Sequence, residues 1–196
     1  MHKPFIPLPL VIVAGGKSSR MGSDKALLPF GGFSTLSEFQ LARLKPYFKS
    51  IYISVKSYLK CPFDASFIED DTRFGDAYSP LVAMLSILEY FQIPVCILSV
   101  DTPFVTPEVF ETLFAQLDEN TDALVATSQS HSHQLCAIYT PSIIPIIRTM
   151  IEKDEHKIRA MLAQCRTKYV SFEEEELFFN LNHPEEYELA KKKYPH

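Results

Sequence analysis

A glycine-rich segment with spaced basic side chains, residues 14–25, is the part of the sequence best suited to chemistry. It contains three glycines among hydroxyl and basic side chains, in the order AGGKSSRMGSDK. Because glycine has no Cβ, its backbone N–H groups can approach an anion closely. Arg20 can bind two phosphate oxygens at once, and Lys25 adds a movable positive charge. The pattern predicts a loop that binds a polyphosphate; the alternative is an ordinary turn with solvated charges.

Two common phosphate-binding motifs do not fit this segment. Residues 16–18, Gly-Lys-Ser, look like the end of a Walker A loop, but that motif requires glycine at the position of Val11. The dinucleotide pattern GxGxxG is also missing from the sequence. The segment therefore belongs to another class of phosphate-binding loop.

Asp101 is the candidate metal ligand. It follows the apolar residues 95–100, so its carboxylate is expected at the carboxyl end of a strand, where open α/β sheets bind ligands. One or two carboxylates together with phosphate oxygens are the usual ligands of Mg²⁺. The alternative role of Asp101 is to cap the turn before Pro103.

Apolar runs alternate with segments of helical periodicity along the chain. Strands are predicted over residues 10–14, 51–55, 94–100, 123–127, 134–139 and 169–172. Helices are predicted to begin near residues 36, 80, 107, 142, 157 and 184. This alternation predicts a single α/β domain over residues 1–196, a three-layer α/β/α fold with a doubly wound, mainly parallel sheet. Residues 56–64 and 129–133 are predicted as long loops.

The glycine-rich segment and Asp101 each follow a predicted strand, and the acidic residues 69–71 are expected at a strand end of the same kind. Since the carboxyl ends of parallel strands meet at one edge of the sheet, we expect a ligand site at that edge.

Composition and charge exclude several classes of protein. The chain has 46% hydrophobic and 22% charged residues and a formal net charge of −5, without the basic excess of a nucleic-acid-binding protein. Its four cysteines form no CxxC pair, which argues against structural zinc and favours a reducing cytoplasm. The apolar residues 5–14 are interrupted by prolines, and residues 81–98 contain polar breaks, so neither segment predicts export or a membrane span.

Residues 13–25, VAGGKSSRMGSDK, closely resemble the signature of the molybdenum cofactor guanylyltransferase (MobA) family, within the Rossmann-like nucleotidyltransferase superfamily. The resemblance continues in order along nearly the whole chain. Residues 79–84 are similar to the G-P-L-A-G loop of that family and residues 100–104 to its C-D-x-P-F segment. Residues 133–139 and 179–186 resemble its H-P-x-x-A-L-Y strand and its F-x-N-x-N-T-P-E-E ending.

This resemblance implies a Mg²⁺-dependent transfer of GMP from GTP to the phosphate of molybdopterin, with release of pyrophosphate. The implied catalytic residues are Arg20, Lys25 and Asp101, and Asp101 is the implied metal ligand. The implied nucleotide-binding residues are Val13, Ala14, Gly15, Gly16, Lys25, Ser54, Asp70 and Asp101. Asn180 and Asn182, with His133, match the region associated with the pterin. Transient contacts with proteins that deliver or accept the cofactor are expected as well.

Several positions leave alternatives open. Ser79 and Ala83 stand where the family loop has glycine, and Ser54 stands where the family commonly has asparagine. A related nucleotidyltransferase using CTP, or a sugar or alcohol phosphate as acceptor, is therefore the second interpretation. A catalytically silent nucleotide-binding module is the third.

The polar residues outside the glycine-rich segment also have structural alternatives. Asp70 could belong to a solvated acidic turn. Asn180 and Asn182 could brace the turn before a helix that starts at Pro184.

Overall fold

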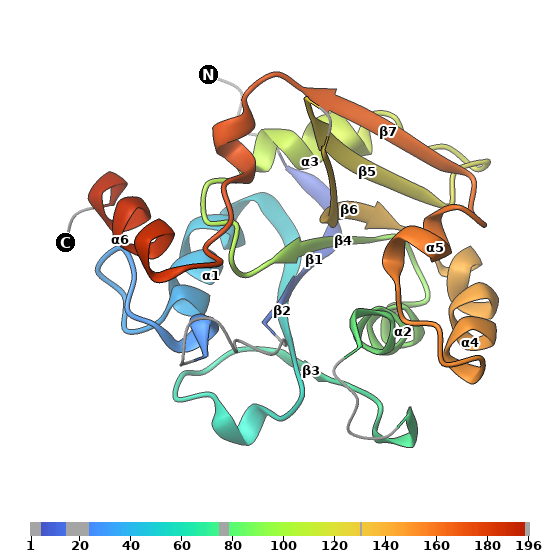
Figure 1. Cartoon of the computed structure of the whole chain (residues 1–196), viewed down its shortest axis with the longest axis horizontal. Coiled ribbons are helices and arrows are strands. Elements are labelled where there is room, and N and C mark those ends of the chain that lie inside the picture. The colour runs from blue at the N-terminus through green and yellow to red at the C-terminus, as the bar shows by residue number, and fades with distance from the viewer. Residues whose placement is uncertain (1–4, 15–23, 75–78, 130, 195–196) are drawn as a thin grey trace.

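The apolar runs form the centre of a seven-stranded sheet with the order β3-β2-β1-β4-β6-β5-β7 (Figure 1). The structure, a computed structural model, describes residues 5–14, 24–74, 79–129 and 131–194. Only β6 runs antiparallel to its neighbours, β4 and β5; the other described pairs are parallel. The strands are β1 (Ile6–Val13), β2 (Phe48–Val55), β3 (Phe67–Glu69), β4 (Val95–Ser99), β5 (Ala123–Ser128), β6 (His131–Tyr139) and β7 (Thr167–Phe172). The predicted mainly parallel sheet is confirmed.

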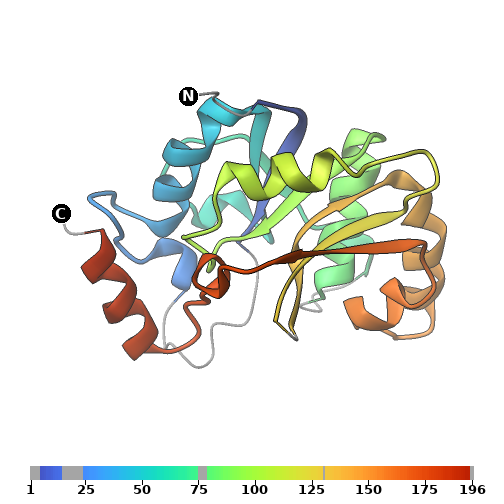
Figure 2. The ribbon, with the colours of Figure 1, turned by 90° about the horizontal axis from the view of Figure 1, so that it is seen from above.

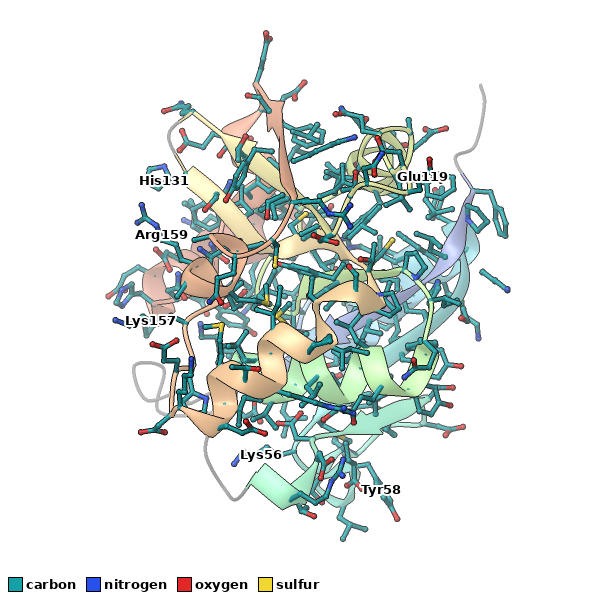
Figure 3. All side chains as sticks on the ribbon, turned by 90° about the vertical axis from the view of Figure 1, so that its right-hand side faces the viewer. Lys56, Tyr58, Glu119, His131, Lys157 and Arg159 are labelled. Atoms are coloured by element: carbon teal, nitrogen blue, oxygen red, sulfur yellow. The ribbon has the colours of Figure 1, made fainter. Side chains whose placement is uncertain are left out.

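Two hydrophobic cores lie on the two faces of this sheet, because the side chains of each strand alternate between them. In β1, Leu10 and Ile12 join the core under one group of helices, whereas Val11 and Val13 join the other core. The first group is α1 (Leu36–Leu44), α3 (Pro107–Phe114) and α6 (Pro184–Lys193). The second is α2 (Pro80–Phe91), α4 (Ile144–Glu152) and α5 (Ile158–Leu162). In Figure 3, α4 lies in front of α2, against which it packs. Among the described residues, no helix is long and apolar enough to cross a membrane.

The helix-start signals act as predicted at two places. Thr35 caps α1, its Oγ1 accepting from Glu38 N at 3.0 Å, and Ser79 caps α2, with Pro80 at the first helical position. At α3, Pro107 holds the first position without a side-chain bond from Thr106.

The C-terminal helix α6 lies beside the segment that leads into α1, although the two are far apart in the sequence (Figure 2). The ring of Phe30 lies 6.2 Å from that of Tyr187, centroid to centroid. Tyr187 also donates a hydrogen bond from its hydroxyl to the carbonyl oxygen of Pro29. These contacts hold the end of the chain next to Lys25 and its neighbours.

Four strands begin earlier than predicted, and β3 was missed: β2 begins at Phe48 rather than residue 51, and β7 at Thr167 rather than residue 169. The differences at β1 and β6 have identifiable causes. β1 begins at Ile6 rather than residue 10 despite its prolines, because β4 pairs with it only from Leu10 onward and the register with β2 shifts between Ile6 and Pro9. Residues 131–133 continue β6 instead of forming a loop, and they pair with residues 126–128 of β5. His131 lies at the outer end of this hairpin (Figure 3).

The buried carboxylate of Asp122 links the segment before β5 to those around Ser142 and Arg166. It lies at the end of the sheet opposite to the start of β6. Asp122, 8% exposed, precedes β5 and accepts hydrogen bonds from the backbone and guanidinium of Arg166 at 2.8–3.0 Å. It also accepts from Ser142 Oγ at 2.6 Å. These bonds from the Arg166 side chain keep the pKa of Asp122 well below its usual range.

We expect Asp122→Ala to lower the free energy of unfolding by about 2 kcal/mol, because it leaves the backbone N–H of Arg166 and the Ser142 hydroxyl without the buried acceptor that Asp122 provides. That loss corresponds to a fall in Tm of about 6 °C for a chain of this size, measurable by calorimetry. Glu188→Ala, which removes only an exposed carboxylate 3.5 Å from Lys191, is the control and should leave Tm almost unchanged. Equal Tm values for the two variants would contradict the assignment.

Candidate active site

Three side chains from distant parts of the chain converge at one edge of the sheet. Lys25 begins a short 3₁₀ turn whose N-cap, Asp24, accepts from Ala26 N at 3.1 Å. The Nζ atom of Lys25 lies 3.3 Å from Asp101 Oδ2 and 3.1 Å from Asn182 Oδ1. The side chains of Lys25 and Asp101 are only 16% and 20% exposed. An ammonium group therefore sits where a carboxylate oxygen and an amide oxygen meet.

Asp101 follows β4 in a turn that is held on several sides. Ser99 Oγ donates to its second carboxylate oxygen, Oδ1, at 2.6 Å, and Thr102 Oγ1 donates to Ser99 O at 2.9 Å. Among the described residues, the Asp101 carboxylate bonds to side chains, while the turn itself is closed by Thr102. These hydrogen bonds place the Asp101 carboxylate against other side chains, and its role toward a ligand stays a prediction.

Asn182 is positioned by the start of α6. Glu186 Oε2 accepts from the backbone N–H of Asn182 at 2.6 Å and of His183 at 2.8 Å. The preceding residue, Leu181, donates from its N–H to Asp101 O at 2.9 Å, so this segment runs beside the Asp101 turn. Glu186 braces the entry to the helix, which leaves the Asn182 side chain for Lys25.

Asn180 is half-buried two residues earlier, and it takes no part in the hydrogen bonds that join Lys25 to Asp101 and Asn182. The structure therefore brings together Asn182, but not Asn180, with the predicted catalytic pair.

The other predicted nucleotide-binding residues lie at the ends of the central strands. Val13 O accepts from Val100 N at 3.1 Å, and Ala14 N donates to Ser54 O at 2.9 Å. These bonds place the end of β1 directly beside the Asp101 turn. Ser54 is 1% exposed, so its carbonyl positions Ala14 while its hydroxyl is buried. Gly15, Gly16 and Arg20 lie outside the described residues.

Asp70 follows β3 at the same edge, and its N–H donates to Val55 O at 3.1 Å. Burial raises the pKa of its carboxyl group to about 6, an effect that the nearby Lys56 partly offsets. Because the folded protein binds this proton more tightly than the unfolded chain, ionisation of Asp70 costs stability as the pH rises from about 4 to about 6.

We therefore expect Asp70→Asn to raise Tm at pH 7 and to leave it almost unchanged at pH 4. The amide carries no charge to desolvate, whereas wild-type Asp70 is ionised at pH 7 and protonated at pH 4. Thermal unfolding curves at the two pH values test this. A lower Tm for the variant at pH 7 would show that the carboxylate is held by favourable contacts instead.

His133, near the start of β6, stacks on Phe178 with ring centroids 4.0 Å apart, and its Nε2 lies 2.7 Å from Ser128 Oγ. Burial lowers the pKa of His133 to about 4, so its ring is neutral at pH 7. β6 runs antiparallel, so its first residues lie at the same edge as the carboxyl ends of the parallel strands.

Ser99 and Gln40 are site residues that sequence reasoning missed. Ser99 is the polar last residue of an otherwise apolar strand, two positions before Asp101. Gln40, in α1, is fully buried between Phe39 and Leu44, and its helical spacing from Leu36 and Leu44 could have indicated a polar residue on the buried face.

Comparison with known proteins places the chain in a defined group. A sequence model described as "MobA-like NTP transferase domain" matches residues 10–169. A molybdenum cofactor guanylyltransferase from Campylobacter jejuni is 39% identical over 184 residues, which cover 93% of this chain and 95% of the relative. One from Helicobacter pylori is 31% identical, covering 97% and 95%.

The fold has a close counterpart among solved structures. Molybdopterin-guanine dinucleotide biosynthesis protein A from Archaeoglobus fulgidus superimposes with a TM-score of 0.82 at 24% identity, covering 95% of this chain and 98% of that one. At this identity the likeness establishes the shared fold.

Proposed function

The chain belongs to the MobA-like NTP transferase family, and we propose that it is a molybdenum cofactor guanylyltransferase. It transfers GMP from GTP to the phosphate of molybdopterin and releases pyrophosphate. The observation that carries this assignment is the contact of Lys25 with Asp101 and Asn182 at the edge where the glycine-rich segment leaves β1. Relatives with this activity match the chain along almost its whole length, which supports the same assignment.

The reaction asks for positioning and charge stabilisation. A phosphate oxygen of the pterin attacks the α-phosphorus of GTP in line, one P–O bond forms, and the bond to the leaving pyrophosphate breaks. Lys25 and Arg20 stabilise the negative charge on the phosphate oxygens, together with backbone N–H groups of residues 14–25. The buried setting of Lys25 strengthens this effect, because water screens its charge poorly.

The residues around Lys25 suit a magnesium ion. Asp101 Oδ2 and Asn182 Oδ1 already face a common cation, the Lys25 ammonium, and both are the oxygen ligands that Mg²⁺ prefers. Among the described residues, no group of three or more His, Cys, Asp and Glu could hold a metal. Mg²⁺ bound by Asp101 and phosphate oxygens fits that arrangement, since this ion commonly takes one or two protein carboxylates. When bound, it would neutralise charge on the phosphates.

The pterin is assigned to the side of the site formed by Asn180, Asn182 and His133. An asparagine amide offers a donor and an acceptor, which match the edge of a pterin ring. Because Nε2 of the neutral His133 ring lies 2.7 Å from Ser128 Oγ, its Nδ1 is the atom that could face the pterin, as donor or acceptor according to the tautomer. Transient contact with proteins that supply molybdopterin or accept the product, in the cytoplasm where GTP is available, belongs to the same proposal.

The departures from the family loop are compatible with guanine as the base. Ser79 and Ala83 are each 5% exposed, and Ser79 Oγ accepts from Val82 N and lies 2.7 Å from His156 Nδ1. Both side chains thus pack within the protein.

A thermal-shift titration with GTP, CTP, ATP and UTP, with and without Mg²⁺, tests the nucleotide. At a GTP concentration of 100 times Kd, binding should add about 2.7 kcal/mol to the free energy of unfolding and raise Tm by about 8 °C. We expect the largest shift for GTP with Mg²⁺. A larger shift for CTP would favour a cytidylyltransferase, and product analysis with molybdopterin or a sugar phosphate would then identify the acceptor.

A further inference from the structure

The turn that carries Asp101 is attached to helix α1 by a buried amide. Gln40 is fully buried, and its Nε2 donates to Val100 O at 3.3 Å and to Thr102 O at 3.2 Å. These two carbonyl groups flank Asp101 directly. The Gln40 side chain thus bonds to the backbone on both sides of Asp101, the proposed catalytic carboxylate.

The orientation of this amide is fixed by its third partner. Arg43 Nε donates to Gln40 Oε1 at 2.8 Å. Since guanidinium nitrogen only donates and carbonyl oxygen only accepts, the Gln40 oxygen must face Arg43 and its nitrogen must face the turn. Every hydrogen-bonding group of the Gln40 side chain is therefore used.

Arg43 holds this position at a cost. Its Nη2 is buried, and no acceptor among the described residues lies within hydrogen-bonding distance of it. Burial lowers the pKa of Arg43 to about 10, and its guanidinium lies 5.8 Å from the centre of the Phe39 ring. A buried donor without an acceptor destabilises the folded state. The favourable contribution of Arg43 is therefore its hydrogen bond to Gln40.

The other groups of the turn leave Gln40 a specific task. Ser99 O accepts from Thr102, and Asp101 O accepts from Leu181 N. Gln40 supplies the donors for the carbonyl groups of Val100 and Thr102. Val100 N donates to Val13 O of β1 and Thr102 N to Ser99 O, so backbone bonds also hold the turn, but they leave the carbonyl groups of Val100 and Thr102 to Gln40. A small rotation of these carbonyl groups would move the Asp101 carboxylate away from Lys25.

We infer that Gln40, oriented by Arg43, is a positioning residue for guanylyl transfer: it fixes the backbone of the Asp101 turn so that the carboxylate faces Lys25 and the nucleotide. Neither residue touches the substrates. The inference rests on the proposed function, because that function gives Asp101 its task.

Gln40→Met tests the inference, since methionine has similar length but neither donor nor comparable acceptor. A displaced reacting group costs up to about 100-fold in rate; we expect kcat to fall at least about tenfold, with KM for GTP changed less than about threefold. Ile147→Ala is the matched control. Ile147 is fully buried in α4 on the opposite face of the sheet, so this variant loses stability without touching the turn.

Both variants are assayed well below their Tm. The control should keep the wild-type kcat, and a wild-type kcat in Gln40→Met would overturn the inference. Should Gln40→Met fail to fold, Arg43→Met is expected to lower kcat in the same direction by a smaller factor, and Arg43→Lys to restore part of it. Unchanged kcat in Arg43→Met would then overturn the inference.

A second measurement separates this inference from the proposed function. Residue-resolved hydrogen exchange reports the amides of Thr102 and Leu181, which bond to Ser99 O and Asp101 O. We expect both to exchange faster in Gln40→Met than in wild type and to be unaffected in Ile147→Ala. Unchanged exchange would overturn the inference even if the wild type transferred no GMP, whereas an inactive wild type with altered exchange would overturn only the function.

Discussion

Replacement of Asp101 by asparagine is expected to lower kcat by about 10³-fold, because it removes the negative charge that faces Lys25 and the proposed magnesium ion. The substitution keeps an oxygen that can accept from Ser99 Oγ, which lies 2.6 Å from Asp101 Oδ1. The ion pair with Lys25 at 3.3 Å is lost, at a cost of about 1 kcal/mol in unfolding free energy. Activity should thus collapse while the fold persists.

The measurement is steady-state formation of pyrophosphate, combined with thermal unfolding of the same sample. Asp118→Asn serves as the control, since Asp118 also pairs with a lysine, Lys168, at 2.7 Å but is 49% exposed and belongs to the loop before β5. It should retain full activity. Turnover close to wild type in Asp101→Asn would remove Asp101 from the reaction.

Lys25→Met is expected to weaken the binding of GTP by about 100-fold and to leave the binding of guanosine within about threefold. Loss of one charged hydrogen bond to phosphate costs about 1.5–3 kcal/mol, and 1.4 kcal/mol corresponds to a factor of ten in Kd. Guanosine has no phosphate, so the ammonium group gives it no comparable contact. Methionine keeps most of the length of the lysine side chain and removes its charge at this poorly exposed position.

Calorimetric titration of wild type and Lys25→Met with GTP and with guanosine measures the change in Kd for each ligand. Lys168→Met, which removes a lysine that is 42% exposed, tests whether any loss of positive charge has the same effect. An equal loss of affinity for GTP and guanosine in Lys25→Met would mean that Lys25 acts on the structure of the site and does not bind the phosphates.

Much of the architecture is encoded locally and could be predicted. The apolar residues of β4 are typical of a strand that is buried on both faces of a sheet. The N-caps Thr35 and Ser79 mark where α1 and α2 begin. The hairpin residues 131–133 escaped prediction because their strand lies beyond the core, where polar side chains show no alternating pattern. The start of β1, which contains Pro7 and Pro9, was not predicted because proline is disfavoured in a central strand. This part of β1 tolerates proline because it pairs with β2 only.

The site could be predicted in part. Lys25, Asp101 and Asn182 were identified by residue type and motif, and the structure brings their side chains together. Ser99 and Gln40 could not be identified in this way. Their importance comes from a hydrogen bond of 2.6 Å within one turn and from bonds across about 60 residues of sequence, and single-sequence patterns carry no information on such pairings.

The Lys25 contacts span 76 residues to Asp101 and 157 residues to Asn182, which has a consequence for the order of events during translation. A nascent chain emerges from its N-terminus, so β1 and β4, the strands that precede Lys25 and Asp101, can pair long before residues 181 and 182 leave the ribosome. Until then Asp101 O lacks its partner, Leu181 N. Residues 181 and 182, which are synthesised after all seven strands, thus complete the site. A chain terminated before them could pair its strands without acquiring the full set of contacts around Lys25.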